Sequence, residues 1–205
     1  MRMLLSNAGK RFNRDWIFRN LNYEFFAGRS YAIVGPNGSG KSTLLQTLSS
    51  SIEMSEGSIK WHINDKQTEP DQVHKHVSIC APYLEVIEEM TAKEFLLFHG
   101  EFKNYQVGIS VKDIIEIVGL EKAANKQIRY YSSGMKQRVK LAQAIFTDTP
   151  LLLLDEPCTN MDATGYELYR HLIENYCKEK TTIVSSNDVN EYSFCTEEIN
   201  VADYK

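Results

Sequence analysis

The sequence has no long apolar run. None of its hydrophobic stretches approaches the length of about 18 residues that a membrane-spanning helix needs. The start of the chain also lacks the pattern of a signal peptide, because Arg2 is followed by only a few apolar residues before Ser6 and Asn7. We therefore expect a chain without a leader or a membrane span, so that any function at a membrane would depend on a partner.

Cysteine is scarce, and an excess of one charge is absent. No two of the four cysteines form a C-x-x-C pair or stand at metal-ligand spacing, so we expect reduced, packed thiols of a cytosolic protein. The formal charge of −4 gives no global reason to expect a nucleic-acid partner. Lys136, Arg138 and Lys140 do cluster, but we expect them to form an ordinary solvated helix face.

The order of the predicted elements favours an α/β fold. Strand patterns dominate the start of the chain, helical patterns fill the stretch from Thr91 to Thr147, and strands then alternate with helices again. The predicted strands after the N-terminal ones are 30–35, 57–63, 76–81, 150–156, 181–186 and 197–202. The predicted helices are 42–51, 91–102, 110–120, a run after Gly134, 163–178 and a short one after Asn187. This order indicates a mostly parallel sheet with an inserted helical lobe.

A glycine-rich loop connects a predicted strand to a predicted helix. Its sequence, GPNGSGKST, matches the pattern G-x-x-x-x-G-K-[ST]. Gly38 and Gly40 allow the backbone to curl so that successive N–H groups face one anion. The alternative is a chance glycine-rich turn, which would not require a strand before it and a helix after it. Lys41 would neutralise the outer phosphates, and the Ser42 hydroxyl could bind Mg²⁺. The predicted nucleotide contacts in the loop are Gly35, Pro36, Asn37, Gly38, Ser39, Gly40, Lys41, Ser42 and Thr43.

A second phosphate motif follows a run of four leucines. The stretch LLLLDEP places Asp155 and Glu156 at the end of a buried strand. Asp155 could hold Mg²⁺ through water, and Glu156 could polarise an attacking water. The alternative is that the two acids are exposed and simply begin a loop. This alternative is less favoured because a glycine-rich phosphate-binding pattern lies upstream.

A third motif, YYSSGMKQR, opens a predicted helix at Tyr130 to Arg138. Ser132 or Ser133 would cap the helix, but capping explains only one serine. A helix N-terminus lined by serine and glycine presents N–H groups and a partial positive charge, which suits an anion.

These three motifs, in this order, resemble the ATP-binding subunits of ABC transporters over essentially the whole chain. The resemblance implies a P-loop NTPase sheet core over about 1–82 and 148–205, with an N-terminal antiparallel β-subdomain and an inserted helical subdomain over about 83–147. It also implies ATP and Mg²⁺ as ligands, the latter held by Ser42 and Asp155. Glu156, Lys41 and Asn187 would be the catalytic residues.

The same resemblance implies a head-to-tail dimer. Ser132, Ser133 and Gly134 stand in a variant of the family's signature sequence and would bind the γ-phosphate of ATP held by a second subunit. Asp162 stands in the loop that crosses the dimer interface. Phe12 matches the aromatic residue that stacks on adenine, and we expect Trp16, a second candidate, to pack in the core because it alternates with Phe18.

Two positions depart from the family pattern. Pro82, nine residues before Thr91, stands where the family has a glutamine, and Asn187 stands where it has a histidine that senses the γ-phosphate. Proline offers no side-chain carbonyl or amide, and Tyr83 or Glu85 could substitute for it. Asparagine can donate a hydrogen bond but cannot carry an imidazolium charge.

The resemblance leads us to expect an energy-coupling ATPase, peripheral on the inner face of the cell membrane. Its partners would be a separate transmembrane permease and a second ATP-binding subunit, with a homodimer favoured and no nucleic acid involved. The alternative is a slow or non-hydrolysing ATP-gated switch. A third reading, a soluble ABC protein of translation or DNA repair, is less favoured, because such proteins carry two cassettes or long coiled coils.

Overall fold

The computed structural model describes all 205 residues and divides the chain into two units. The first unit consists of Met1–Val77, Thr149–Glu156 and Glu179–Lys205. The second consists of Ser78–Asp148 and Pro157–Lys178. Each unit is therefore built from segments that are separated in the sequence.

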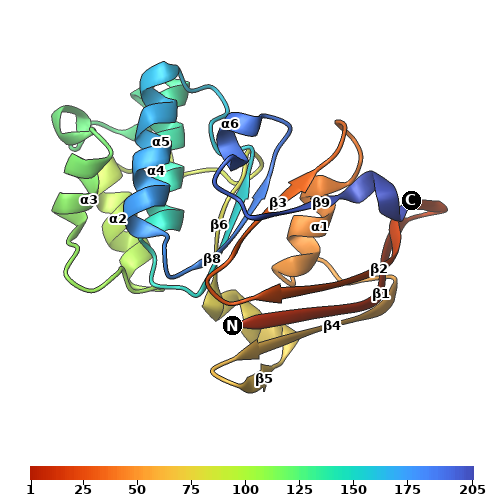
Figure 1. The fold of residues 1–205 in the computed structure, drawn as a ribbon. Coiled ribbons are helices and arrows are strands. Elements are labelled where there is room, and N and C mark those ends of the chain that lie inside the picture. The colour runs from red at the N-terminus through yellow and green to blue at the C-terminus, as the bar shows by residue number, and fades with distance from the viewer. The chain divides into compact units, whose positions relative to one another are not determined.

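An antiparallel sheet forms the N-terminal part of the first unit, in the strand order β2-β1-β4-β5 (Figure 1). Its strands are β1 (Arg2–Phe12), β2 (Asp15–Phe26), β4 (Glu56–Ile63) and β5 (Lys66–Thr68). Met3, Phe18 and Phe25 are fully buried on it. A short 3₁₀ helix, Pro70–His76, follows the sheet. The sequence patterns predicted these strands except for β5, whose three polar residues have no strand signal.

Parallel strands form the rest of the first unit, in the order β7-β8-β3-β9. They are β3 (Ser30–Val34), β7 (Leu151–Asp155), β8 (Thr181–Ser185) and β9 (Glu197–Asn200). The unit also contains helices α1 (Lys41–Leu48) and α6 (Val189–Tyr192) and a last 3₁₀ turn, Val201–Tyr204. Every leucine of β7 is fully buried, as expected for a strand of a parallel sheet that is covered on both faces.

The carboxyl ends of these parallel strands carry the motifs. The glycine-rich loop follows β3, the acid pair ends β7, and Asn187 lies just beyond β8. Because parallel strands point the same way, their carboxyl ends meet at one edge of the sheet, where α/β proteins bind their ligands. The fold thus gathers loop, acids and Asn187 at one edge of the first unit.

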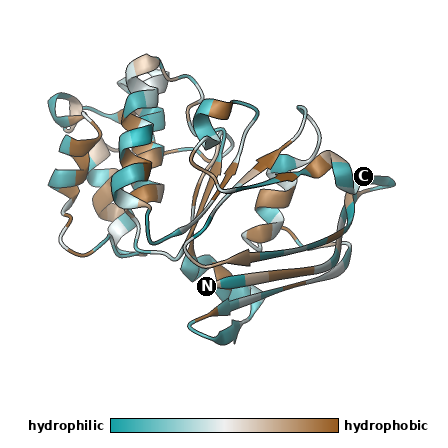
Figure 2. Ribbon diagram, viewed as in Figure 1, coloured by the Kyte–Doolittle hydropathy of each residue, from teal (hydrophilic) through white to brown (hydrophobic).

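Helices dominate the second unit. They are α2 (Ala92–Gly100), α3 (Val111–Ile117), α4 (Ser133–Phe146) and α5 (Ala163–Tyr176). Strand β6 (Val77–Cys80) leads into the unit, and 3₁₀ turns at Glu121–Ala123 and Ile128–Tyr130 precede α4. α4 packs against α2, α3 and α5. Figure 2 shows hydrophobic and hydrophilic residues mixed on these helices, whereas the strands of the parallel sheet are mainly hydrophobic.

Two of these helices begin with a reciprocal cap. Thr91 caps α2 and accepts from the Glu94 N–H, while the Glu94 carboxylate accepts from the Thr91 N–H. Ser110 and Asp113 form the same capping box at α3. None of the helices combines the length and the apolar character that crossing a membrane requires.

Candidate functional site

The glycine-rich loop curls through three glycines with positive φ. Gly35, Gly38 and Gly40 have φ of 139°, 76° and 108°. The N–H of Ser39 donates to the carbonyl of Pro36 at 3.0 Å, which closes a turn at the tip of the loop. A Cβ at Gly40 would lie 2.2 Å from Cγ2 of Ile17, so both the backbone and the space require glycine there.

Lys41 opens helix α1 from within this loop. Its side chain is largely buried, and Nζ donates to the carbonyls of Gly35 at 2.9 Å and Pro36 at 3.4 Å. The loop is thus closed around its own ammonium group. An anionic ligand would attract the same ammonium more strongly than a neutral carbonyl does.

The acid pair at the end of β7 divides into a buried and an exposed carboxyl group. Asp155 is 2% exposed, and its Oδ1 has no hydrogen-bond partner. Glu156 is exposed, has a φ of 44°, and its N–H donates to the Ser185 carbonyl at 2.8 Å. A buried, unpartnered carboxylate oxygen is costly unless a ligand satisfies it. With the hydroxyl of Ser42 at the start of α1, Asp155 provides the hard oxygen atoms that suit Mg²⁺.

A cavity of about 310 Å³ opens at this edge of the first unit. We call it the nucleotide cavity. It is lined by Ile17, Asn37, Gly38, Gly40, Lys41, Ser42, Thr43 and Glu156. The loop residues Asn37, Lys41 and Thr43 therefore lie beside Glu156 of the acid pair. Ile17 also lines the cavity, but no sequence pattern identifies it.

The other predicted residues of the first unit lie outside this lining: Phe12, Gly35, Pro36, Ser39, Asp155 and Asn187. Asn187 donates from Nδ2 to Oδ1 of Asn37 at 2.6 Å, which connects the end of β8 to the glycine-rich loop. Phe12 ends β1 with 48% of its surface exposed, and the ammonium of Lys10 lies 5.0 Å from its ring centroid. The ring is available for stacking.

The prediction that Trp16 packs in the core beside Phe18 is wrong. Trp16 is only partly buried, and the guanidinium groups of Arg11 and Arg19 lie 5.5 and 4.5 Å from its ring. The cause is an irregular register, in which Lys10 pairs with Phe18 but Arg11 pairs with Trp16. This bulge breaks the alternation, so Trp16 and Phe18 do not share one face of β2.

The remaining predicted site residues belong to the second unit. Ser132 caps α4, and its hydroxyl accepts from the Met135 N–H at 3.3 Å. A Cβ at Gly134 would lie 3.4 Å from the carbonyl oxygen of Asn160, so the helix start packs closely on the loop before α5. Asp162 caps α5, where hydrogen bonds from the Thr164 hydroxyl and the Gly165 N–H lower the pKa of its carboxyl group.

These residues surround a second cavity, of about 360 Å³, which we call the signature cavity. Its lining consists of Ser132, Ser133, Gly134, Met135, Arg138, Asn160, Met161, Asp162 and Gly165. Ser133 is exposed at the N-terminus of α4, so that helix end opens onto a hollow that its own chain leaves accessible. The serine and glycine residues predicted an anion site at this helix start, and the family resemblance added Asp162.

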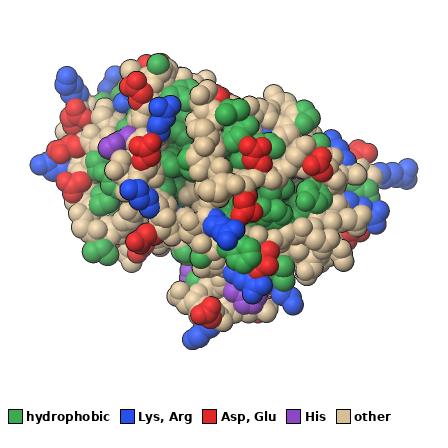
Figure 3. Space-filling model, in the orientation of Figure 1, with side chains coloured by type: hydrophobic (Ala, Val, Ile, Leu, Met, Phe, Trp, Pro, Cys, Tyr) green, Lys and Arg blue, Asp and Glu red, His purple; other side chains and the backbone are tan.

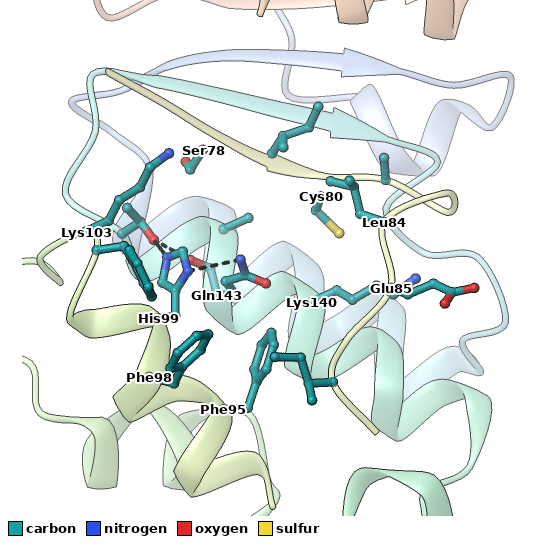
Figure 4. Close-up of a pocket in the computed structure, with 16 residues that line it drawn as sticks. Ser78, Cys80, Leu84, Glu85, Phe95, Phe98, His99, Lys103, Lys140 and Gln143 are labelled. Carbon is teal, nitrogen blue, oxygen red and sulfur yellow. Dashed lines mark hydrogen bonds between the residues drawn. The ribbon is translucent and has the colours of Figure 1, made fainter. Parts of the chain in front are cut away.

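A third cavity, of about 300 Å³, was missed by sequence reasoning (Figure 4). Phe95 and Phe98 of α2 line it together with Leu84 and Lys140, and Phe98 is 44% exposed at its mouth. We call it the apolar pocket. Its lining comes from three separated stretches of sequence, 78–87, 95–103 and 140–147, so no local pattern predicts it.

A closed set of hydrogen bonds forms one wall of the apolar pocket (Figure 4). Gln143 Nε2 donates to Nδ1 of His99 at 3.1 Å, and His99 Nε2 lies 3.0 Å from the Thr147 hydroxyl. That hydroxyl donates to the Gln143 carbonyl, so it accepts from Nε2–H of the imidazole. Burial, with a smaller contribution from Lys103, lowers the pKa of His99 to about 4, which keeps the ring neutral.

The basic cluster of α4 is not the plain solvated face that we expected. Lys136 pairs with the Glu88 carboxylate, Arg138 donates to the Val118 carbonyl at 3.2 Å, and Lys140 donates to the Pro82 carbonyl at 3.3 Å. All three are therefore partly covered. On the face shown in Figure 3, acidic and basic side chains are interspersed.

Gln137 is another residue that sequence reasoning missed. It is buried on α4, and its Nε2 donates to the Pro157 carbonyl at 2.7 Å and lies 3.6 Å from Sγ of Cys80. This side chain thus ties α4 to the segment that follows the acid pair in the sequence. The pattern offers a weak signal for it, because Gln137 falls on the apolar stripe with Leu141 and Ile145.

Comparison with known proteins points to one family. The model of the ABC transporter family matches residues 18–159. The uncharacterized ABC transporter ATP-binding protein YybJ of Bacillus subtilis is 33% identical over 87% of this chain and 81% of its own length. The uncharacterized ABC transporter ATP-binding protein YcbN of the same bacterium is 29% identical over 94% of this chain. The chain spans 63% of the length of YcbN.

Solved structures of ABC proteins have the same fold. A putative ABC transporter ATP-binding protein from Pyrococcus furiosus superposes with a TM-score of 0.83, at 19% identity, with complete coverage of both chains. The ATP-binding cassette MJ0796, in a dimeric post-hydrolysis state bound to ADP and Pi, has a TM-score of 0.79 at 25% identity, covering 97% of this chain and 93% of its own. These likenesses confirm the predicted P-loop α/β fold class.

Proposed function

This chain belongs to the ABC transporter family, and we propose that it is an energy-coupling subunit that binds and hydrolyses ATP. One observation carries the proposal: a glycine-rich loop with a buried lysine and an acid pair with one unpartnered carboxylate oxygen lie at the carboxyl ends of two parallel strands, β3 and β7, that both pair with β8. The ADP and Pi bound by the MJ0796 cassette support ATP as the substrate.

The nucleotide cavity would hold the phosphates. Lys41 would exchange its two carbonyl acceptors for phosphate oxygens, while the backbone N–H groups of the loop face the same anion. Ser42 and the free Oδ1 of Asp155 would hold Mg²⁺. Bound Mg²⁺ would neutralise charge on the outer phosphates. Phe12, with 48% of its surface exposed, would stack on the adenine.

Glu156 is the proposed general base. It lines the nucleotide cavity, is exposed, and is held by a backbone hydrogen bond to the Ser185 carbonyl. From that position its carboxylate would orient an attacking water and accept its proton. Asn187, at the adjacent strand end, stands where the family has its γ-phosphate sensor, but its amide donates to Asn37 instead.

Replacing Lys41 with Ala tests the nucleotide proposal. We expect the dissociation constant of Mg-ATP to rise about 10-fold or more, because a charge-assisted contact is lost. Isothermal titration calorimetry measures it, with Lys66→Ala on the exposed strand β5 as the matched control. Equal affinity in Lys41→Ala and Lys66→Ala would contradict the proposal.

A second copy of this chain is the proposed first partner. The signature cavity presents the start of α4 and Asp162 at an open surface, and the family resemblance assigns these positions to ATP held by the other subunit. The dimeric state of the MJ0796 cassette supports this arrangement. In the proposed head-to-tail dimer, Ser133 and Gly134 of each chain would face the nucleotide cavity of its partner.

A separate transmembrane permease is the proposed second partner, and the apolar pocket is its proposed docking surface. Phe98 and Phe102 are 44% and 72% exposed, and their ring centroids lie 5.0 Å apart, so they form a small exposed aromatic cluster that a partner could cover. Docking there would place the chain on the inner face of the membrane. The membrane protein encoded beside its gene is the permease to test.

Phe98→Ser with Phe102→Ser should abolish co-purification with that membrane protein and leave Mg-ATP affinity unchanged. Val107, which is 97% exposed outside the pocket, provides the control Val107→Ser. Retained co-purification by the double variant would contradict this docking surface.

A slow or non-hydrolysing ATP-gated switch is the second candidate function, favoured by Pro82 and Asn187. Losing one preorganised donor to developing charge typically costs about 10²- to 10³-fold in rate. Asn187→His should then raise the turnover number, measured as phosphate release. A lower turnover number in this variant would show that the asparagine is a working adaptation.

A further inference from the structure

The tip of the glycine-rich loop is connected to the end of β8 by one side-chain hydrogen bond. Nδ2 of Asn187 donates to Oδ1 of Asn37 at 2.6 Å. Asn37 and Gly38 are the two central residues of the turn that the Ser39 N–H closes onto the Pro36 carbonyl. The φ of 76° at Gly38 fits a type II turn. The contact therefore reaches the part of the loop that no strand or helix supports.

Asn187 is itself held in place on both sides. The Ser186 N–H donates to the Ile33 carbonyl at 3.3 Å, and the Asp188 N–H donates to the Ser186 hydroxyl at 2.9 Å. The Asp188 carboxylate in turn caps α6. Because its neighbours are already ordered, the amide of Asn187 can hold Asn37 at little further cost in conformational entropy.

This contact differs from the other side-chain contact inside the loop. Lys41 donates to the Gly35 and Pro36 carbonyls, and a bound phosphate would compete for that ammonium. The two amides of Asn187 and Asn37 are neutral, so a phosphate has less attraction for them than for Lys41. The amide pair can therefore persist when a nucleotide is bound.

We propose that Asn187 is a positioning residue that holds the tip of the phosphate loop in its nucleotide-binding shape through Asn37. The inference rests on the proposed nucleotide binding by this loop and adds a role that does not involve the γ-phosphate. A group that acts on the γ-phosphate distinguishes ATP from ADP. A group that acts on the loop supports both nucleotides equally.

The test compares ADP with a non-hydrolysable ATP analogue in the full chain, by calorimetry with Mg²⁺ present. Asn187→Leu has a similar volume without the amide, and Asn37→Ala removes the acceptor. Each variant should raise the dissociation constants of both nucleotides by the same factor, about 3- to 10-fold. The double variant should be no weaker than the weaker single variant, because both changes delete the same bond.

Asn190→Ala, on α6 beside the turn, is the matched control and should bind both nucleotides as the unmodified chain does. Equal melting temperatures would show that the variants remain folded. A weaker ATP analogue with unchanged ADP, additive effects in the double variant, or unchanged binding would each overturn the inference. Absence of nucleotide binding by the unmodified chain would overturn the proposed function as well.

Discussion

At the scale of single residues, His99 has an environment that changes its acid–base chemistry. Its two ring nitrogens are both used, one accepting from Gln143 and one donating to Thr147. Burial is the main cause that lowers its pKa from 6.5 to about 4. Protonation would convert the accepting nitrogen into a donor that faces another donor, so the neutral ring is the form that fits the wall of the apolar pocket.

This environment predicts a pH dependence of stability. Because the folded pKa of about 4 lies below the unfolded value of 6.5, the unfolded chain binds more protons between these values. The stability contribution is therefore complete above pH 6.5 and is lost as the pH falls towards 4. Allowing for screening at a partly exposed site, we expect the unmodified chain to lose about 1–2 kcal/mol more than His99→Gln over this range.

Urea unfolding at a series of pH values measures this difference. His171→Gln, on α5, should follow the unmodified chain. If His99→Gln and the unmodified chain have the same pH profile, the imidazole is not held neutral by its surroundings.

Individual site residues could be predicted from the sequence where chemistry requires a fixed spacing. Gly38 and Gly40 have the positive φ values that were expected of them, because a tightly curled loop needs them. Trp16 could not be predicted, because the bulge that exposes it depends on pairing with a different strand. The hydrogen bond between Asn37 and Asn187 depends on the order of β3 and β8 in the sheet, which no local pattern specifies.

At the scale of elements, helix α2 depends on its first residue. Thr91 and Glu94 satisfy each other's backbone N–H groups, which the helix would otherwise leave without partners. Thr91→Ala should lower the free energy of unfolding by about 1 kcal/mol. Thr91→Ser should retain most of this contribution, because serine also caps through its hydroxyl. Urea denaturation measures both, and equal losses in the two variants would show that the hydroxyl does not act as a cap.

The sequence predicts elements well where local signals agree. Helical spacing of the apolar residues predicted the helix from Thr91, and four leucines in succession predicted β7. Strand β5 was missed because Lys66–Thr68 is short and polar and is defined only by its pairing with β4. The apolar pocket was missed for the same reason, since its walls meet only when distant segments pack.

At the scale of the whole molecule, the predicted site is divided between two units. Lys41, Asp155 and Glu156 belong to the first, whereas Ser133 and Asp162 belong to the second. The proposed dimer explains this division, because each nucleotide cavity would be completed by a signature cavity of the other chain.

The dimer leads to a specific prediction. Glu156→Gln in excess Mg-ATP should block hydrolysis and give a species of twice the 23.5 kDa mass of one chain by size-exclusion chromatography with light scattering. Adding Ser133→Arg should return it to the monomer, because the arginine fills the anion position at the start of α4. Ser193→Arg, at an exposed position of the first unit, is the control. A monomer under every nucleotide condition would contradict the head-to-tail arrangement.

The backbone at Glu156 has a consequence for how this protein can evolve. A φ of 44° is unfavourable for any residue with a Cβ and costs about 1–3 kcal/mol, whereas glycine adopts it freely. Glu156→Gly should therefore have a higher free energy of unfolding than Glu156→Gln, which urea denaturation measures. The same substitution would remove the proposed general base. Selection for stability therefore favours glycine at this position, whereas selection for ATP turnover favours glutamate. The glutamate is retained only as long as selection for turnover is the stronger of the two.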